Sequence, residues 1–211
     1  MNSPYDKSVA RYERWYEEHR AAYLSELAAL RELVPGGRGL EVGAGTGRFA
    51  SPLGIMVALD ASRPMLRHCR EEGVERVQGR AEGLPFRNGC FDHVLMVTAL
   101  CFFDDPVTAL QEARRVVVGD GHLTLGILDR DSPPGREYWN GSGKFLSQAR
   151  PLTTSHVLEM LRATGWEPSR VIQTLCSGTG ISEPEAFLEG HGQGLFVAIS
   201  ARRSHLAVSR R

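Results

Sequence analysis

The 211-residue sequence has few of the features that mark metal-binding, disulfide-rich or membrane proteins. Its four cysteines lie far apart and form no Cys-x-x-Cys pair, which argues against a zinc site and against a disulfide framework. No stretch approaches the roughly 20 consecutive apolar residues that span a bilayer, and the polar N-terminus has no apolar segment of a secretion signal. We therefore expect a cytoplasmic protein without a metal and without a membrane partner.

The sequence also has no net charge and almost no lysine. Its 25 basic residues balance 25 acidic residues, so no overall field attracts nucleic acid or an anionic membrane. Lys7 and Lys144 are its only lysines, and a coding bias explains this preference for arginine better than phosphate recognition does. The composition favours a small-molecule substrate over nucleic acid, and the length favours one domain, as a monomer or a homodimer.

Alternating apolar and helical stretches predict an α/β fold. Short apolar runs at 38–42, 55–60, 74–79, 91–98 and 122–129 are separated by helical segments, which is typical of βαβ units and a parallel sheet. Two further runs, 171–176 and 195–200, have no comparable helix between them, so we expect them to pair antiparallel. The prediction is a Rossmann-like, doubly wound, mostly parallel seven-stranded sheet with a C-terminal antiparallel hairpin.

Helix ends are also recognisable. The predicted N-caps are Ser62, Asp104 or Asp105, and Thr153 or Thr154. We divide the single domain, 1–211, into an N-terminal helical cap at 1–35, a core at 36–130, and a closing part at 131–211. The closing part holds a helix, the hairpin and, around 129–151, a segment long enough to form a lid.

Aromatic residues mark the N-terminal helical region. Over residues 8–33, apolar side chains recur in steps of three and four, which predicts one amphipathic helix. Its aliphatic second half should pack on the core. Its first half carries Tyr12, Trp15 and Tyr16, which either pack in the same way or roof a pocket, and the sequence leaves both possibilities open.

A glycine-rich turn follows the first predicted strand. The segment LEVGAGTG at 40–47 places glycines where ligands bind in open α/β sheets, and glycine permits positive φ and close approach to the backbone. The spacing is G-x-G-x-G, with Arg48 where a dinucleotide fingerprint has its third glycine. Glu41, at the edge of the turn, suits a cationic amine or hydroxyl groups better than a pyrophosphate.

A second acidic residue, Asp60, ends the next predicted strand. Its carboxylate is placed to accept both hydroxyls of a ribose, as acidic residues do in nucleotide-binding folds. Asp60 could instead merely precede the Ser62 cap. We favour the ribose because the glycine turn and this position occur together.

These segments together resemble the class I S-adenosylmethionine-dependent methyltransferases, in particular the small type-11-like group. EVGAGTG is similar to the first family motif, DASRPML to the second, and GRAEGLPFRNGCFDHVLM to the third and fourth. The resemblance covers about residues 36–130 in uninterrupted order. It implies an enzyme that transfers a methyl group from S-adenosylmethionine and releases S-adenosylhomocysteine.

The resemblance implies roles for residues at matching positions. Glu41 would fix the glycine turn and face the amino end of the methionine, Asp60 would hold the ribose, and Met65 would pack on the adenine. Leu100 would lie at the methionine end of the site, together with Thr98 and Ala99. The cofactor-binding set is Glu41, Gly43, Ala44, Gly45, Gly47, Asp60, Ala61, Met65, Ala81, Glu82, Thr98 and Ala99.

The acceptor end is less defined. The family often carries histidine after the fourth strand, where this chain reads TALCFFDDP, so no catalytic base is identified. Holding the reactants in line can lower the barrier by roughly 7 to 11 kcal/mol without a base. Candidate substrate contacts, each with an alternative reading as packing or solvated surface, are Tyr12, Trp15, Tyr16, Cys101, Phe102, Arg130 and Tyr138.

Other functions stay open on the sequence alone. One is a noncatalytic module that binds the cofactor or its product and acts through a partner. Another uses the same pocket for different chemistry, such as aminopropyl transfer, or for a nicotinamide cofactor.

Overall fold

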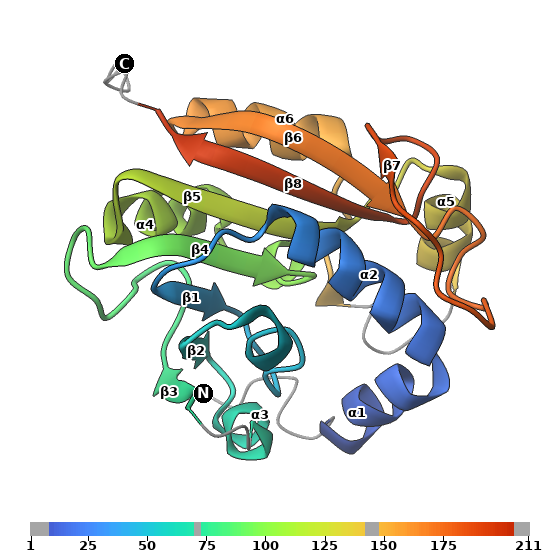
Figure 1. The fold of residues 1–211 in the computed structure, drawn as a ribbon, viewed down its shortest axis with the longest axis horizontal. Helices are drawn as coiled ribbons and strands as arrows, with labels where there is room; N and C mark the ends of the chain where they lie inside the picture. Colours follow the sequence, from blue (N-terminus) through green and yellow to red (C-terminus); the bar gives the residue numbers. More distant parts are fainter. Residues whose placement is uncertain (1–8, 70–72, 142–147, 205–211) are drawn as a thin grey trace.

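The computed structural model describes residues 9–69, 73–141 and 148–204. They form an eight-stranded sheet, in the order β3-β2-β1-β4-β5-β8-β6-β7, with helices on both faces (Figure 1). The parallel strands are β1 (Gly39–Val42), β2 (Val57–Asp60), β3 (Glu75–Gln78), β4 (Phe91–Val97) and β5 (Val117–Leu128). The antiparallel strands are β6 (Trp166–Thr174), β7 (Leu188–Glu189) and β8 (Phe196–Arg203).

This topology confirms the predicted α/β class and its antiparallel end. β8 lies between β5 and β6, so the two C-terminal runs pair directly, as expected. The sheet has one strand more than predicted, because the two-residue β7 pairs with the edge of β6 and is too short to leave a periodic pattern. Strand order reverses between β1 and β4, which is where open α/β sheets bind ligands.

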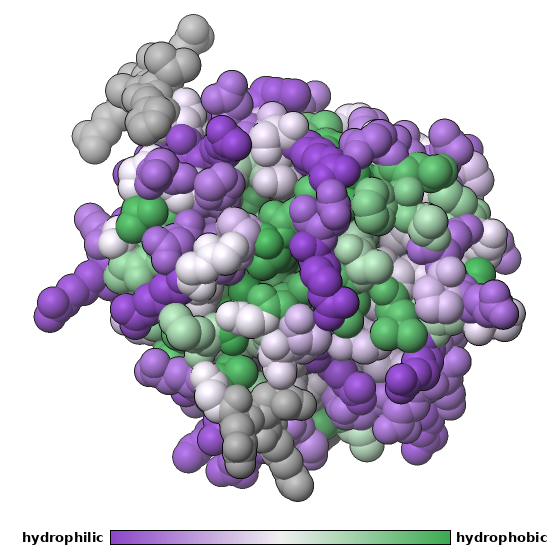
Figure 2. Space-filling model, viewed as in Figure 1, coloured by the Kyte–Doolittle hydropathy of each residue, from purple (hydrophilic) through white to green (hydrophobic). Residues whose placement is uncertain are grey.

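Side chains alternate along β4 and divide the core into two layers. Val94 and Met96 pack in the layer with helices α4 (Pro106–Val116) and α6 (Thr154–Ala163), whereas Leu95 and Val97 pack in the layer with α2 (Arg20–Leu33). Figure 1 shows α2 in front of the sheet and α4 and α6 behind it. On this front face, hydrophobic residues lie on both sides of a central band of hydrophilic residues, and most of the rim is hydrophilic (Figure 2).

Helices begin where the sequence predicts capping residues. Ser62 Oγ accepts a hydrogen bond from the Met65 N–H at 3.4 Å at the start of α3 (Arg63–His68). Asp105 and Thr153 accept equivalent bonds at the starts of α4 and α6. Each bond satisfies an N–H group that the first helical turn leaves without a partner.

The N-terminal helical region is divided, which corrects the prediction of one helix over 8–33. α1 (Val9–Glu18) and α2 meet at His19, whose φ of −116° and ψ of 43° are not helical. The His19 ring stacks on Trp15 at 4.7 Å between ring centroids. The apolar periodicity continues across the bend, so the sequence pattern does not reveal it. Figure 1 shows α1 turned away from the line of α2.

The predicted lid segment contains a helix of its own, α5 (Pro133–Asn140), capped by Ser132. Residues 142–147 of that segment lie outside the described residues. Short 3-10 turns, η2 (Ser51–Leu53) and η3 (Leu100–Phe102), complete the elements. Within the described part of the chain, no helix is long and apolar enough to cross a membrane.

His93 is a buried polar residue on β4. Neither of its ring nitrogens has a hydrogen-bond partner among the described residues. Burial lowers the pKa of its imidazole, and His122 on β5 acts in the same direction while Asp92 opposes it. The folded protein therefore holds His93 in its neutral form more strongly than the unfolded chain does.

We expect His93→Leu to reduce the acid sensitivity of the fold. An unfolded histidine binds a proton near pH 6.5, so wild-type stability is lost as pH falls from there toward the lower folded pKa. The substitution also removes an unpaired buried polar group, which costs about 1 to 3 kcal/mol. Thermal unfolding at pH 8 and pH 5 measures the effect, with the exposed His156→Gln as control. An unchanged pH dependence in His93→Leu would contradict this account.

Candidate active site

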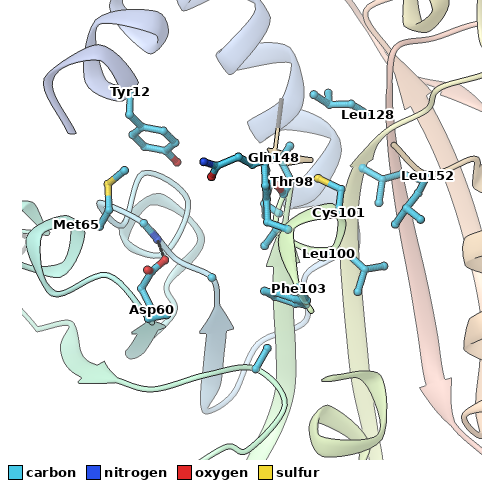
Figure 3. Close-up of a pocket in the computed structure, with 18 of the residues that line it drawn as sticks. Tyr12, Asp60, Met65, Thr98, Leu100, Cys101, Phe103, Leu128, Gln148 and Leu152 are labelled. Carbon is cyan, nitrogen blue, oxygen red and sulfur yellow. Dashed lines mark hydrogen bonds between the residues drawn. The ribbon is translucent and has the colours of Figure 1, made fainter. Parts of the chain in front are cut away.

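A cavity of about 730 Å³ opens at the carboxyl ends of β1, β2 and β4. It continues from the glycine loop to the aromatic residues of α1 and α5, and Figure 3 shows part of its lining. Its volume lies within the roughly 300 to 1,000 Å³ that is usual for small-molecule sites. Its place at the strand-order reversal is the ligand site expected for this sheet topology.

The glycine loop forms one end of this cavity. Gly43 and Gly45 line it with φ of +75° and +56°, which L side chains rarely adopt. A Cβ on Gly43 would lie 2.5 Å from the Cβ of Ala99, and one on Gly45 would lie 3.2 Å from the Tyr12 hydroxyl. The absence of side chains therefore leaves the backbone open to a ligand and lets neighbouring segments approach closely.

The Asp60 carboxylate ties the end of β2 to this loop. Its Oδ2 accepts a hydrogen bond from the Gly45 N–H at 2.8 Å (Figure 3). Its Oδ1 accepts one from the Ser62 N–H at 2.7 Å. The carboxylate also lines the cavity, and an ionised carboxylate is an acceptor suited to hydroxyl donors. Ala61 and the 2% exposed Met65 line the cavity beside Asp60.

Glu41 lies behind the loop and does not line the cavity. Its side chain is buried, the Ala50 N–H bonds to the carboxyl group, and Oε2 has no partner among the described residues. Burial, together with the charge of Asp60, raises the pKa of Glu41 to about 8. Ala44 is also buried behind the loop, and Gly47 packs against Cys69. These three residues support the loop and do not face the cavity.

The segments that follow β3 and β4 form the next part of the wall. Ala81 and Glu82 line it, and Glu82 Oε1 accepts hydrogen bonds from the N–H groups of Asp104 at 2.9 Å and Asp105 at 3.3 Å. Ala99 and Leu100 also line the cavity. Thr98 adopts a φ of +47°, which is uncommon for a β-branched residue and marks local backbone strain beside the cavity.

Aromatic side chains enclose the other end. Tyr12, Trp15 and Tyr16 of α1 line the cavity, together with Tyr138 of α5. The rings of Tyr12 and Tyr16 meet edge to face at 5.0 Å, and their hydroxyl oxygens lie 3.3 Å apart. Burial raises the pKa of Tyr138 to about 12, so its hydroxyl is neutral at physiological pH. The sequence left open whether the rings of α1 pack on the core or roof a pocket, and in the structure they line the pocket.

Comparison with known proteins identifies the family. The methyltransferase domain family matches residues 40–125. A solved structure from Thermotoga maritima, an S-adenosylmethionine-dependent methyltransferase described as a possible histamine N-methyltransferase, is 43% identical, covers 95% of this chain and 98% of its own, and superposes with a TM-score of 0.92. This chain belongs to the S-adenosylmethionine-dependent methyltransferases.

Two curated relatives match this methyltransferase over most of its length. An uncharacterized protein of Methanocaldococcus jannaschii is 37% identical over 201 residues, covering 94% of this chain and 98% of the relative. An uncharacterized protein of Mycobacterium tuberculosis is 35% identical over 208 residues, covering 92% and 72%. Family membership makes the chain an enzyme with S-adenosylmethionine as its cofactor.

The geometry of the cavity fits this cofactor. Gly43 and Gly45 border the cavity with backbone alone, so an extended methionine moiety can lie against them. The Asp60 carboxylate can accept ribose hydroxyls, and the buried Met65 offers an apolar contact for a flat base. These are the groups that the sequence resemblance implies at matching positions.

Two predicted substrate contacts of the methyltransferase differ in position, because Cys101 lines the cavity and Arg130 does not. Cys101 lines the cavity, but burial raises the pKa of its thiol to about 12, so it is not a nucleophile at neutral pH. Phe102 lines the cavity beside it. Arg130 does not line the cavity, because it is half exposed and pairs with Asp131 at 3.1 Å. The prediction of a substrate contact at Arg130 is therefore not supported.

The structure adds lining residues that the sequence analysis missed. The charged members of this group are Glu26 of α2, Arg80 and Asp104. The signal of Glu26 was its place on the apolar face of the helix with Tyr23 and Leu30. The Gln148 amide faces the Tyr12 hydroxyl in Figure 3. No local pattern marks the others, because only the fold brings them together. They include Phe103, Leu128, Trp139, Gln148 and Leu152.

We expect Asp60→Ala to weaken S-adenosylmethionine binding by about 10- to 100-fold. The substitution removes a charged acceptor and releases the Gly45 N–H, and hydrogen bonds to charged groups contribute about 1.5 to 3 kcal/mol each. Titration calorimetry measures the affinity, and the exposed Asp120→Ala serves as the control. Equal affinity of Asp60→Ala and wild type would show that Asp60 does not hold the ribose.

Proposed function

We propose that this enzyme methylates a small-molecule acceptor by in-line transfer, mainly through proximity and orientation. The observation that carries the proposal is that one cavity joins the glycine loop and Asp60 to an aromatic chamber formed by α1 and α5. A chamber of this kind suits a compact acceptor with an apolar body. The neutral charge balance gives no support to a nucleic-acid substrate.

The cofactor supplies a methyl group activated by a positively charged sulfonium. The residues of the chain then have two tasks. Asp60 and the backbone of the glycine loop hold and orient the cofactor. The rings of Trp15, Tyr16 and Tyr138 enclose the acceptor and exclude water from it. Holding the two reactants in line in this way can lower the barrier to methyl transfer by roughly 7 to 11 kcal/mol.

The chamber offers few groups able to act as a base. Burial keeps the Cys101 thiol protonated and raises the pKa values of Tyr12 and Tyr16 well above their ordinary value. These groups are neutral at physiological pH and can bind an acceptor by hydrogen bonds or packing. They do not take up a proton from it.

A labelled methyl group tests the proposal. The enzyme is incubated with methyl-tritiated S-adenosylmethionine and a metabolite extract, and radioactivity is measured in small-molecule, protein and RNA fractions. We expect label in a small-molecule product, and about 10- to 100-fold less with Asp60→Ala at subsaturating cofactor. Label confined to RNA or protein would contradict a small acceptor. Cofactor binding without transfer to any fraction would instead support the noncatalytic binding module.

A further inference from the structure

Glu26 is a carboxyl group buried in the wall of the active-site cavity. It belongs to α2, lines the cavity and is only 2% exposed. No hydrogen bond or ion pair joins its carboxyl group to any residue within 9–69, 73–141 and 148–204. An apolar side chain would be cheaper to bury at this position, because a polar group without a partner is costly in an apolar environment.

The groups that face Glu26 are aromatic. Burial raises the pKa values of Tyr16 of α1, Tyr23 of α2 and Tyr138 of α5, and the charge of Glu26 adds a smaller increase to each. Burial alone raises the pKa of Glu26 to about 8, and no cationic side chain of the described residues lowers it. Glu26 is therefore an acidic group in an otherwise neutral, aromatic chamber.

A buried carboxylate surrounded by aromatic rings has the chemistry of a site for an organic cation. A cation gains charge-assisted hydrogen bonds from the carboxylate and attraction from the faces of nearby rings. Trp15 lines the same chamber and adds a further ring. Since burial raises the pKa of Glu26 to about 8, its carboxyl group is mostly protonated in the empty chamber at neutral pH. A bound ammonium ion would favour the ionised form, which can then accept the proton, whereas an anion would oppose ionisation and a neutral acceptor would give it no counter-charge.

We propose that Glu26 binds the amino group of the methyl acceptor and takes up its proton, so that the acceptor is a small amine with an apolar body. This inference rests on the proposed function and specifies the acceptor atom and the base. Nitrogen, and not oxygen, sulfur or carbon, would receive the methyl group.

The proton and the electrons balance in this step. A proton moves from the ammonium nitrogen to an Oε of Glu26, which frees the nitrogen lone pair. That pair forms the nitrogen–carbon bond as the carbon–sulfur bond of the cofactor breaks and leaves its electrons on sulfur. The product is a methylated ammonium beside a neutral carboxyl group. A base with a pKa near the working pH is suited to this transfer.

Paired ligands test the recognition directly. Calorimetry with saturating S-adenosylhomocysteine compares butylamine with 1-butanol, benzylamine with benzyl alcohol, and 2-phenylethylamine with 2-phenylethanol. We expect wild type to bind at least one amine about tenfold or more tightly than its alcohol, as a charge-assisted bond implies. Glu26→Gln should lose this preference and keep its affinity for S-adenosylhomocysteine. The inference is overturned if wild type prefers no amine, or if Glu26→Gln keeps the preference.

A control variant lies on the same helix. Glu32→Gln removes a carboxylate that is exposed, pairs with Arg170 at 2.7 Å and lies outside the cavity. It should keep the amine preference of wild type. Glu26→Asp keeps the charge on a shorter side chain and should weaken the preference without abolishing it. Should Glu26→Gln fail to fold, an unchanged preference in Glu26→Asp would overturn the inference.

The pH dependence of stability gives a measurement that needs no substrate. Glu26 has an ordinary pKa of 4.5 and a folded pKa of about 8, so the folded state holds a proton that the unfolded chain releases. Wild-type stability is therefore lost as pH rises through this window. The unfolding temperature of Glu26→Gln should rise relative to wild type between pH 5 and pH 9. A constant difference would show that the carboxyl group is not desolvated as the inference requires.

Failure of this inference can be told apart from failure of the proposed function. If the tritiated methyl group is found on the oxygen or sulfur of a small molecule, Glu26 is not the base for an amine, while small-molecule methylation stands. If the enzyme binds S-adenosylhomocysteine and labels no small molecule, the proposed function itself fails.

Discussion

The hydrogen bond between the Gly45 N–H and the Asp60 carboxylate is the contact on which the site depends. It joins the loop after β1 to the end of β2 at 2.8 Å and holds a backbone with positive φ in one conformation. Glu41 supports the same loop from behind, and burial, with a further contribution from the charge of Asp60, raises its pKa to about 8. The pair can thus carry one negative charge where two would repel. A positively charged cofactor beside them would favour the ionised forms.

A second set of contacts fastens the aromatic chamber to this loop. Glu13 of α1 accepts a hydrogen bond from the Thr46 hydroxyl at 2.5 Å and pairs with Arg48, while the Tyr23 hydroxyl of α2 donates to the Arg48 carbonyl at 2.7 Å. The bend at His19 makes this possible, since α1 leaves the line of α2 there. These contacts therefore connect the loop that holds the cofactor to the helix that encloses the acceptor. Order in one supports order in the other.

The sequence predicted the features that have strong local causes. Period-two apolar runs, the Ser62 and Thr153 caps and the glycine spacing each reflect a backbone requirement that short segments express. Features set by tertiary contacts were not predicted from the sequence. The helix break at His19 interrupts no apolar period, and Trp139 and Gln148 reach the cavity only because the fold brings them there. Glu26 did leave a signal, a charge on an apolar helix face, but periodicity alone does not say which cavity it borders. Arg130 lies outside the cavity lining and pairs with Asp131, because residue type does not determine the direction of a side chain.

The division between family pattern and acceptor chemistry has a physical basis. The family match covers residues 40–125, which include the cofactor loop and Asp60. Because the cofactor is the same, it imposes one set of backbone constraints on that segment. Glu26, Tyr16 and Tyr138 lie outside it, on helices that cover the sheet and can change without disturbing its register. The Thermotoga maritima structure aligns over 95% of this chain, so the likeness extends to these helices as well. Acceptor specificity should therefore be sought in α1, α2 and α5, where side chains, and not backbone geometry, determine what the cavity admits.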